Sequence, residues 1–371
     1  MKVLIAAGGS GGHIFPAVAL ARKLREIRPD VDILFVGSNK SLDKSIFEKE
    51  NFRYSLLSAN KLPYRITPKI VTFLIKMKFD CLKSLFLAAS YRPDVMVGFG
   101  GYISSVVSLA SFVLRVPIAA HEQNVVPGRA NKFLFRWAAK IAVSFKETER
   151  FIREDASKVV LTGNPVRARI CSATGAKCDR PACLKKFGFV PDKFTILLIG
   201  GSQGAHFLNE KFVEAVAGMD EKVKSSLQVI HITGIKDYGR TVSEYEKMPI
   251  EARVYSFIDR IEDAYTVSDL IITRSGASAL FEIALFEKPM ILIPYPYAMS
   301  HQAENAGAFS ARGAAVEIAE KDLSAALFKD KISNLMNDKA ALNNLAMRAG
   351  DLKMPEAADN LARLVLGLSR R

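Results

Sequence analysis

A run of glycine, serine and histidine at residues 8–13, Gly-Gly-Ser-Gly-Gly-His, is the first part of the chain that could do chemistry. It follows the apolar run KVLIAA and precedes the run IFPAVALARKLREI, so we expect a strand, a tight turn and the start of a helix. Glycine lets the backbone turn sharply and approach a ligand closely, and the amino end of a helix attracts anions. The pattern therefore favours a phosphate-bearing ligand, the alternative being a turn that only packs a strand against a helix.

The two commonest phosphate motifs do not match this turn. G-x-G-x-x-G counted from Gly9 needs glycine at position 14, which is Ile14, and no Lys-Ser or Lys-Thr follows as in a P-loop. His13 is the candidate general base, because a neutral imidazole titrates near working pH. It could equally only donate a hydrogen bond to phosphate or cap its helix. Glu122, in the stretch HEQN at 121–124, is the rival base, although His121 and Glu122 could equally hold a loop to the sheet.

The elements that must position these residues alternate between apolar strands and helices, which predicts parallel sheets covered by helices. We expect strands at 3–7, 33–37, 95–98, 117–120, 140–144 and 159–161, and again at 195–199, 228–232, 252–255, 270–273 and 290–293. The second series opens with TILLIGGSQGAHFLNEKFVEAV, which repeats the first opening: an apolar strand, Gly-Gly-Ser, glycine and a helix. Two similar α/β domains joined near 165–190 explain this repeat. Ligands of open parallel sheets lie beyond the carboxyl ends of the strands, so both glycine turns are predicted to line a cleft between the domains.

Length and composition agree with two soluble globular domains, because the chain has 371 residues, 49% hydrophobic and 24% charged. We expect neither a signal peptide nor a membrane-spanning helix, since no apolar run is long enough. The net charge of +14 favours a nucleic acid, an anionic membrane or a phosphorylated substrate. Nucleic acid is disfavoured, because the chain has no recognition-helix, zinc-finger or RNP-like pattern.

Metal chemistry is not expected. Cys81, Cys171, Cys178 and Cys183 contain no Cys-x-x-Cys pair and are predicted to be free thiols. The only Asp-x-Asp string is Asp30-Val31-Asp32, which lies at the start of an expected strand, the wrong end for a ligand site. Without a metal, a diphosphate leaving group needs backbone N–H groups at helix starts and a fixed cation such as Arg167.

Six blocks of sequence together resemble the MurG family of bacterial transferases. They are GGSGGHIFPAVALA, GFGGYISS at 98–105, HEQN at 121–124, GNPVR at 163–167, GGSQGA at 200–205 and RSGASALFEIA at 274–284. The resemblance runs from residue 3 to about residue 306 and implies a GT-B fold, in which two Rossmann-like parallel-sheet domains face an interdomain cleft. It further implies an acceptor and membrane-facing domain at 1–166, a sugar-donor domain at 167–352 and a last helix at 353–371 that crosses back to the first domain.

The activity that this resemblance implies is an inverting transfer of N-acetylglucosamine from UDP-N-acetylglucosamine to the muramyl 4-hydroxyl of undecaprenyl-pyrophosphoryl-muramyl-pentapeptide. The implied enzyme is a hexosyltransferase of peptidoglycan synthesis that needs no cofactor, binds no nucleic acid and works peripherally at the cytoplasmic face of the membrane. The alternatives are another GT-B transferase acting on a membrane lipid, a UDP-sugar epimerase, which would need carboxylate acid and base groups, and a non-catalytic nucleotide-sugar binding protein.

The resemblance also assigns site residues. Glu282 is placed to accept hydrogen bonds from the ribose hydroxyls, the backbone of Ile258 to meet uracil and Gln302 to lie near the sugar. His301 stands where a second glutamine is expected, so the preference for N-acetylglucosamine is less secure than that for uridine diphosphate. The donor-binding set is Ser10, Gly11, Gly12, Asn124, Arg167, Ser202, Ile258, Ala277, Ser278, Ala279, Leu280, Phe281, Glu282 and Gln302, and the acceptor-binding set is Gly100, Gly101 and Tyr102.

The segment 61–92 is both basic and apolar, with seven Lys or Arg residues and one acidic residue, Asp80. Its helical part carries one apolar stripe of Ile70, Phe73, Leu74 and Met77, and a second of Val71, Ile75, Phe79, Leu82 and Phe86. A core explains one stripe, and a second stripe beside lysines suits anionic lipid headgroups. The predicted membrane-facing residues are Lys69, Phe73, Lys76 and Lys83; the alternative is a buried helix with a solvated basic edge.

Overall fold

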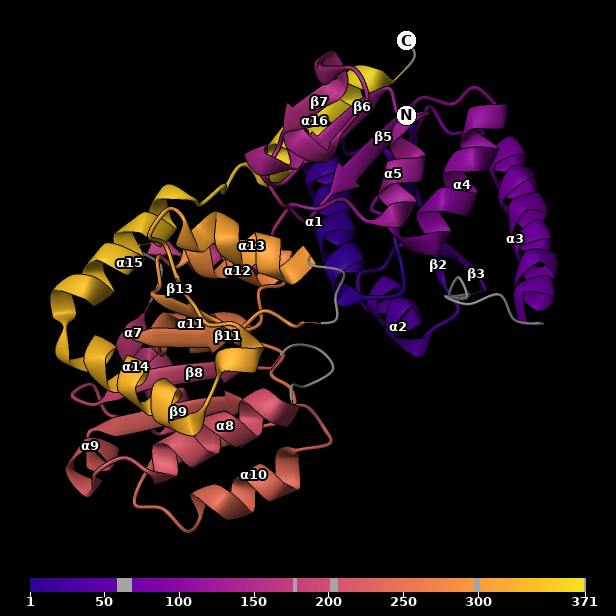
Figure 1. Cartoon of the computed structure of the whole chain (residues 1–371). Helices are drawn as coiled ribbons and strands as arrows, with labels where there is room; N and C mark the ends of the chain where they lie inside the picture. The colour runs from indigo at the N-terminus through magenta and orange to yellow at the C-terminus, as the bar shows by residue number, and fades with distance from the viewer. Residues whose placement is uncertain (59–68, 176–178, 201–205, 297–300, 370–371) are drawn as a thin grey trace. The chain divides into compact units, whose positions relative to one another are not determined.

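The computed structural model describes residues 1–58, 69–175, 179–200, 206–296 and 301–369, without the side chains of 69 and 70. They form two compact units, Met1–Arg167 with Met354–Arg371, and Ala168–Lys353 (Figure 1). Each unit holds one sheet, and all the strand pairs described are parallel. This confirms the predicted α/β class with two parallel-sheet domains. The cleft that this class implies stays a prediction.

The first unit has a seven-stranded sheet in the order β3-β2-β1-β4-β5-β6-β7. Its strands are β1 (Lys2–Ala6), β2 (Asp32–Ser38), β3 (Arg53–Leu57), β4 (Val95–Gly98), β5 (Ile118–Glu122), β6 (Lys140–Val143) and β7 (Val159–Leu161). Its helices are α1 (Gly11–Ile27), α2 (Ser41–Lys49), α3 (Lys69–Tyr91), α4 (Gly101–Val113), α5 (Arg129–Phe135), the short 3-10 helices η1 (Lys146–Phe151) and η2 (Ala156–Lys158), and the last helix α16 (Ala357–Leu368). The central residues of the inner strands β1, β2 and β4 are apolar and buried because helices cover both faces of the sheet.

Helix α16 completes the core of this first unit although it comes last in the chain. In Figure 1 the yellow α16 lies beside the indigo α1, and the two helices are in contact. Leu361, Ala362 and Val365 are fully buried in the same apolar cluster as Ile5 and Phe35 of the sheet. Burial of three such side chains stabilises the unit by several kcal/mol, at roughly 0.8 kcal/mol per buried methylene group.

The second unit has a six-stranded sheet in the order β10-β9-β8-β11-β12-β13. Its strands are β8 (Phe194–Ile199), β9 (Leu227–Ile232), β10 (Glu251–Tyr255), β11 (Leu270–Thr273), β12 (Met290–Leu292) and β13 (Val316–Glu317). Its helices are α6 (Ala168–Ser172), α7 (Arg180–Phe187), α8 (His206–Ala217), α9 (Glu221–Ser225), α10 (Tyr238–Tyr245), α11 (Ile261–Val267), α12 (Ala277–Leu285), α13 (His301–Ser310), the 3-10 helix η4 (Glu320–Asp322), α14 (Ala325–Asn337) and α15 (Lys339–Asp351). The order repeats that of the first sheet, with β8 and β9 in the places of β1 and β2.

Every strand that the sequence predicts is present, with ends shifted by at most two residues. Two strands were not predicted: β3, with the sequence RYSLL, and β13, which has two residues. Both lie at a sheet edge, where an apolar run is not needed. Among the described residues, no helix is long and apolar enough to cross a membrane.

Candidate active site

The first glycine turn leads from β1 into the amino end of α1. Gly9 has φ +86°, a left-handed conformation that favours glycine, and Ser10 is the extended N-cap residue of α1. The N–H groups of His13 and Ile14 both donate to the carbonyl of Ser10, each over 3.2 Å. The N–H groups of Gly11 and Gly12 have no acceptor among the described residues. They lie where the helix dipole is positive, so this turn can hold an anionic group.

His13 lies directly after these two amides. Its Nδ1 is 3.4 Å from the carbonyl oxygen of Gly8, and because a carbonyl can only accept, this contact fits the tautomer that carries its proton on Nδ1. The lone pair is then on Nε2. Burial lowers the pKa of His13 below 6.5, against the opposing charges of Glu122 and Asp43 and the contact with Gly8. The imidazole is therefore neutral at neutral pH, the form that a general base requires.

Of the predicted acceptor residues, Gly101 lies against His13, whereas Gly100 lies against Asn131 of α5. Both have positive φ, +90° and +77°, at the start of α4. A Cβ atom on Gly101 would lie 3.3 Å from Nδ1 of His13, so glycine is needed for the two helix starts to approach this closely. Tyr102 instead points to α3, where its hydroxyl donates to Oδ2 of the buried Asp80 over 2.8 Å.

Glu122 is buried at the end of β5, and its carboxylate accepts four hydrogen bonds. Oε1 accepts from the backbone N–H and the side-chain amide of Asn124, over 2.9 and 3.1 Å. Oε2 accepts from the N–H of Gly128 and from Nδ2 of Asn131, over 3.1 and 2.8 Å. Both oxygens of this carboxylate are therefore engaged by donors from the following loop and from α5. The structure thus favours the alternative in which His121 and Glu122 hold this loop to the sheet.

His121, beside Glu122, also serves the loops. Its Nε2 is 3.1 Å from the carbonyl oxygen of Gly163, in the block GNPVR that ends the first unit. Burial lowers the pKa of His121 to about 4, so it is neutral. The last residue of that block, Arg167, stacks on α1, with its guanidinium carbon 4.5 Å from the centre of the Phe15 ring. Arg167 therefore contacts α1, the helix that also carries His13, which precedes Phe15 by two residues.

In the second unit, the predicted nucleotide residues gather at the starts of α12 and α13. Ala277, Leu280 and Phe281 are buried in the core. In the first turns of α12, the half-exposed residues are Ser278 and Ala279. The carboxylate of Glu282 accepts a hydrogen bond from the hydroxyl of Tyr265 over 3.1 Å, which holds it in place. Ile258 lies in the loop after β10, where the guanidinium of Arg169 donates to the carbonyl of the next residue, Asp259.

Gln302, in the first turn of α13, links two loops of the second unit. Its side-chain oxygen accepts from the N–H of Tyr295 over 2.9 Å, and its carbonyl accepts from the hydroxyl of Ser275 over 2.7 Å. Arg274, which the sequence analysis did not single out, supports the same loops: it donates to the carbonyl of Ile293 and pairs with Glu320. One sign of this role is visible in the sequence, since Arg274 is the first residue of the block RSGASALFEIA that carries the family resemblance.

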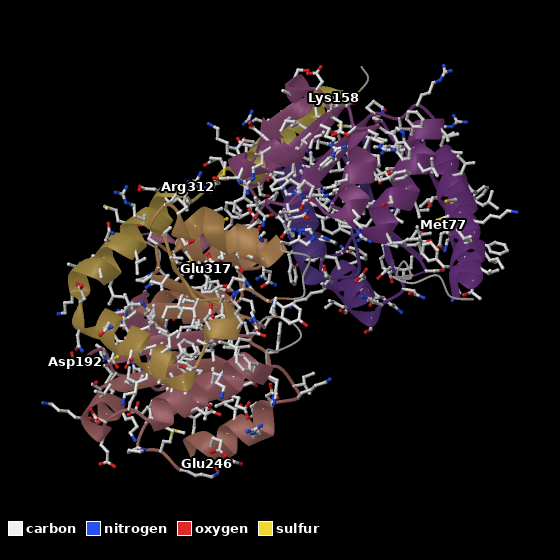
Figure 2. All side chains as sticks on the ribbon, in the orientation of Figure 1. Met77, Lys158, Asp192, Glu246, Arg312 and Glu317 are labelled. Carbon is white, nitrogen blue, oxygen red and sulfur yellow. The ribbon has the colours of Figure 1, made fainter. Side chains whose placement is uncertain are left out.

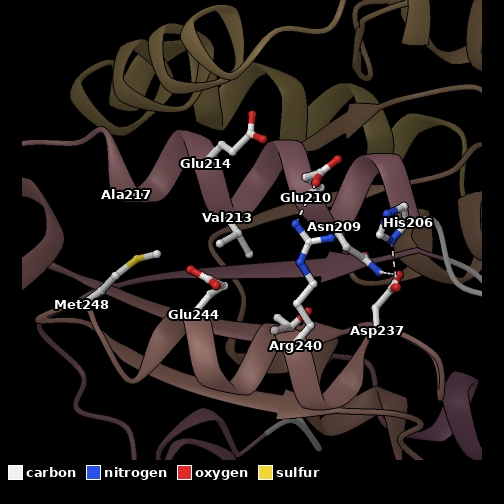
Figure 3. Close-up of a pocket in the computed structure, with 11 residues that line it drawn as sticks. His206, Asn209, Glu210, Val213, Glu214, Ala217, Asp237, Arg240, Glu244 and Met248 are labelled. Carbon is white, nitrogen blue, oxygen red and sulfur yellow. Dashed lines mark hydrogen bonds and ion pairs between the residues drawn. The ribbon is translucent and has the colours of Figure 1, made fainter.

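The second glycine turn, including Ser202, lies outside the described residues, but the helix that follows it does not. His206 begins α8, and its Nδ1 is 2.8 Å from Oδ1 of Asp237, the residue before α10 (Figure 3). Asn209 donates to the other oxygen of Asp237, also over 2.8 Å. The buried His231 lies 3.1 Å from Asn209 Oδ1, and burial lowers its pKa to about 3. The carboxylate of Asp237, in the segment after β9, thus fixes the start of α8.

Helix α3 exposes the whole of the second apolar stripe. Phe79 and Phe86 are 65% and 76% exposed, and Val71, Ile75 and Leu82 are also exposed, as is Leu74 of the first stripe. Figure 2 shows side chains of α3, near the labelled Met77, that project away from α4. The assignment of Phe73 to the membrane face was wrong: it is 8% exposed and packs against the Tyr102 ring, 5.9 Å between centres. Lys76 and Lys83 are exposed, and the side chain of Lys69 lies outside the described residues.

The Asp-x-Asp string occupies the predicted place before and at the start of β2. The exposed Asp30 pairs with Arg28, and the half-buried Asp32 pairs with Arg53. In the part of the chain that the structure describes, no three His, Cys, Asp or Glu side chains lie close enough to hold a metal ion. Cys81, Cys171 and Cys183 are free thiols, and Cys178 lies outside the described residues.

Comparison with known proteins agrees with this geometry. Residues 3–143 match the N-terminal domain model of glycosyltransferase family 28, and residues 195–361 match its C-terminal domain model. Transferases from Halothermothrix orenii and Thermodesulfovibrio yellowstonii are each 35% identical to the chain, over 98% and 100% of both proteins. Each is named UDP-N-acetylglucosamine–N-acetylmuramyl-(pentapeptide) pyrophosphoryl-undecaprenol N-acetylglucosamine transferase.

Solved structures show the same fold. The crystal structure of MurG from Acinetobacter baumannii has a TM-score of 0.77 and 24% identity, with 99% of each chain covered. A UDP-GlcNAc 2-epimerase from Neisseria meningitidis, bound to UDP-GlcNAc, has a TM-score of 0.72 and 12% identity, with 99% and 100% covered. Because two domain models match most of the chain and full-length relatives are 35% identical to it, the chain belongs to glycosyltransferase family 28 and, within it, to the MurG family.

Proposed function

We propose that the protein is a hexosyltransferase that transfers N-acetylglucosamine from UDP-N-acetylglucosamine to the muramyl 4-hydroxyl of undecaprenyl-pyrophosphoryl-muramyl-pentapeptide, with inversion. Its full-length relatives carry the name of this reaction. The observation in the molecule that carries the proposal is a neutral His13 beside the amides of Gly11 and Gly12 at the start of α1. A base next to an anion-binding helix start is what transfer from a nucleotide sugar requires.

The reaction is a single displacement at the anomeric carbon of the donor sugar. The acceptor hydroxyl forms the new C–O bond while the bond to the diphosphate breaks and its electron pair leaves with UDP. Nε2 of His13 takes the hydroxyl proton, since Nδ1 faces the Gly8 carbonyl. The charge that develops on the diphosphate is met by backbone N–H groups at helix starts and by Arg167, while the Glu282 carboxylate accepts from the ribose hydroxyls.

An epimerase of the same fold is the alternative. UDP-N-acetylglucosamine 2-epimerases are among the similar structures, but at 12–14% identity they speak only to the fold. Glu122, a first-unit carboxylate whose charge acts on His13, is engaged by four N–H donors, whereas an epimerase needs carboxylates that exchange protons with the sugar. The transferase is therefore the better supported function.

The activity is tested by measuring UDP release with and without an acceptor that carries the muramyl-pentapeptide on a short lipid pyrophosphate. We expect release that depends on the acceptor and persists in EDTA, because amides and Arg167 take the place of a metal. Conversion of UDP-N-acetylglucosamine to its 2-epimer without acceptor would identify an epimerase instead. Reversible loss of turnover in EDTA, without unfolding, would overturn the metal-independent mechanism.

The proposal includes peripheral docking of α3 on the anionic cytoplasmic face of the membrane, where the acceptor lipid resides. The exposed apolar residues of α3, above all Phe79 and Phe86, lie on the same helix as the exposed Lys76, Lys78 and Lys83. Apolar side chains enter the headgroup boundary, and each lysine near an anionic surface contributes about 1 kcal/mol.

We expect the double variant Phe79→Ser, Phe86→Ser and the charge variant Lys76→Glu each to weaken binding to phosphatidylglycerol vesicles, measured by sedimentation. The control is Met347→Ser, on the exposed face of α15 in the second unit, which should bind as the unchanged protein does. Turnover of a water-soluble acceptor should survive all these changes. If both α3 variants sediment like the unchanged protein, α3 is not the docking surface.

A further inference from the structure

A carboxylate outside the predicted site, that of Asp43 on α2, is completely buried beside the first glycine turn. It accepts from the N–H of Gly9, at 3.2 Å to Oδ1 and 2.9 Å to Oδ2. Oδ2 also accepts from the N–H and the hydroxyl of Ser38, over 2.8 and 2.7 Å. A buried charge is tolerated only when such donors compensate for its lost water. From α2, Asp43 thus holds the first glycine turn to the end of β2 by hydrogen bonds.

The contact with Gly9 fixes more than one atom, because the Gly8–Gly9 peptide is planar. Its N–H points to Asp43, and its C=O, on the opposite side of a trans peptide, is the carbonyl that contacts His13 Nδ1. A Cβ atom on Gly8 would lie 2.6 Å from Asp43 Oδ2, so only glycine allows this approach. Lys40 donates to the carbonyl of Gly9 over 2.7 Å and holds the next peptide.

The order carboxylate, peptide, imidazole has a direct chemical consequence. A hydrogen bond from N–H to a carboxylate polarises the peptide and makes its carbonyl oxygen a better acceptor. A stronger acceptor at the Gly8 carbonyl favours the tautomer of neutral His13 that carries its proton on Nδ1. It also makes the lone pair on Nε2 more basic. An aspartate that contacts histidine directly does the same in hydrolase triads.

We propose that Asp43 is a positioning residue for His13, which acts through the Gly8–Gly9 peptide to fix the orientation and tautomer of the imidazole. The inference rests on the proposed role of His13 as base, and it adds Asp43 as the residue that orients this base. The charged and titratable groups that face His13 are Asp43 from α2 and Glu122 and His121 from β5. Of these, Asp43 is the one joined to His13 by a continuous chain of hydrogen bonds among the described residues.

The test compares Asp43→Asn with Ser38→Ala. Asparagine removes the charge and brings N–H groups toward the N–H of Gly9, whereas Ser38→Ala removes a hydrogen bond to the same carboxylate and leaves Gly9 held. We expect Asp43→Asn to lower kcat roughly 10- to 100-fold, as a misplaced catalytic group does, with a smaller change in donor KM. Its acidic limb of kcat/KM should move to lower pH, because a negative charge that raises the pKa of His13 is lost. Ser38→Ala should change neither, although both variants lower Tm.

Two further measurements separate positioning from loss of structure. In ¹⁵N-histidine NMR spectra, we expect His13 to carry its proton on Nδ1, and to shift toward the Nε2 tautomer in Asp43→Asn. In a His13→Ala background, Asp43→Asn should cost nothing further in kcat. The proposal is overturned if Asp43→Asn matches Ser38→Ala in kcat and tautomer, or if its cost is equal with and without His13. A failure of His13 as base would instead appear as a normal kcat in His13→Ala alone.

Discussion

We expect replacement of His13 by alanine to lower kcat by about 100- to 10,000-fold while the KM for the nucleotide sugar changes little. The loss falls on kcat because a base acts as the acceptor hydroxyl gives up its proton, in the transition state. Steady-state kinetics of UDP release measures both constants. In the unchanged protein the activity should fall only as the pH drops through the pKa of His13, which burial places below 6.5.

The control for this prediction is Glu122→Gln, which keeps the size of the side chain in its buried place. We expect it to lower the free energy of unfolding by about 1–3 kcal/mol, since an amide turned toward Gly128 and Asn131 leaves a donor unsatisfied. Its kcat, measured on the folded fraction, should change far less than that of His13→Ala. A raised donor KM with normal kcat in His13→Ala would make His13 a phosphate contact and return Glu122 as the candidate base.

We expect the substitution Glu282→Ala to weaken UDP binding by about 1.5–3 kcal/mol for each hydrogen bond that the carboxylate is proposed to accept from a ribose hydroxyl. That is roughly a tenfold to hundredfold rise in Kd per bond. Isothermal titration with UDP measures it, and circular dichroism confirms that the fold is kept.

The matched control is Tyr265→Phe, which removes only the hydroxyl that donates to Glu282 Oε2. Its ring stays in the buried site, so we expect a smaller loss of UDP affinity than for Glu282→Ala. An unchanged affinity in Glu282→Ala would remove this residue from the nucleotide site.

The sequence predicted the sheets well because their signal is local. A parallel strand covered on both faces is a short apolar run, and such runs identified the inner strands of both units. The edge strands β3 and β13 have mixed sequences, since one side of an edge strand meets solvent, and they were missed. The start of α1 could be predicted for the same local reason, from glycines followed by a helical pattern.

The roles of single polar residues depend on contacts that a sequence does not display. Glu122 reads as a possible base, but its four donors come from the following loop and from α5. Phe73 shares a helical stripe with exposed residues, yet it is buried and packs against the Tyr102 ring on α4. Asp43 belongs to no motif: it meets Gly9 because β2 pairs in register with β1, so the segments after both strands lie together.

The place of α16 has a consequence for how the protein is made. Domains usually fold in the order in which the ribosome releases them. Here the chain leaves the first unit at Arg167 and returns to it at Met354, and Leu361, Ala362 and Val365 fill part of its core. During synthesis of the second unit, the first unit therefore lacks α16, and the apolar surface of α1 that α16 covers stays exposed. The core of the first unit can be completed only after α16 has been synthesised, so the unit whose synthesis begins first is finished after the second unit has been made.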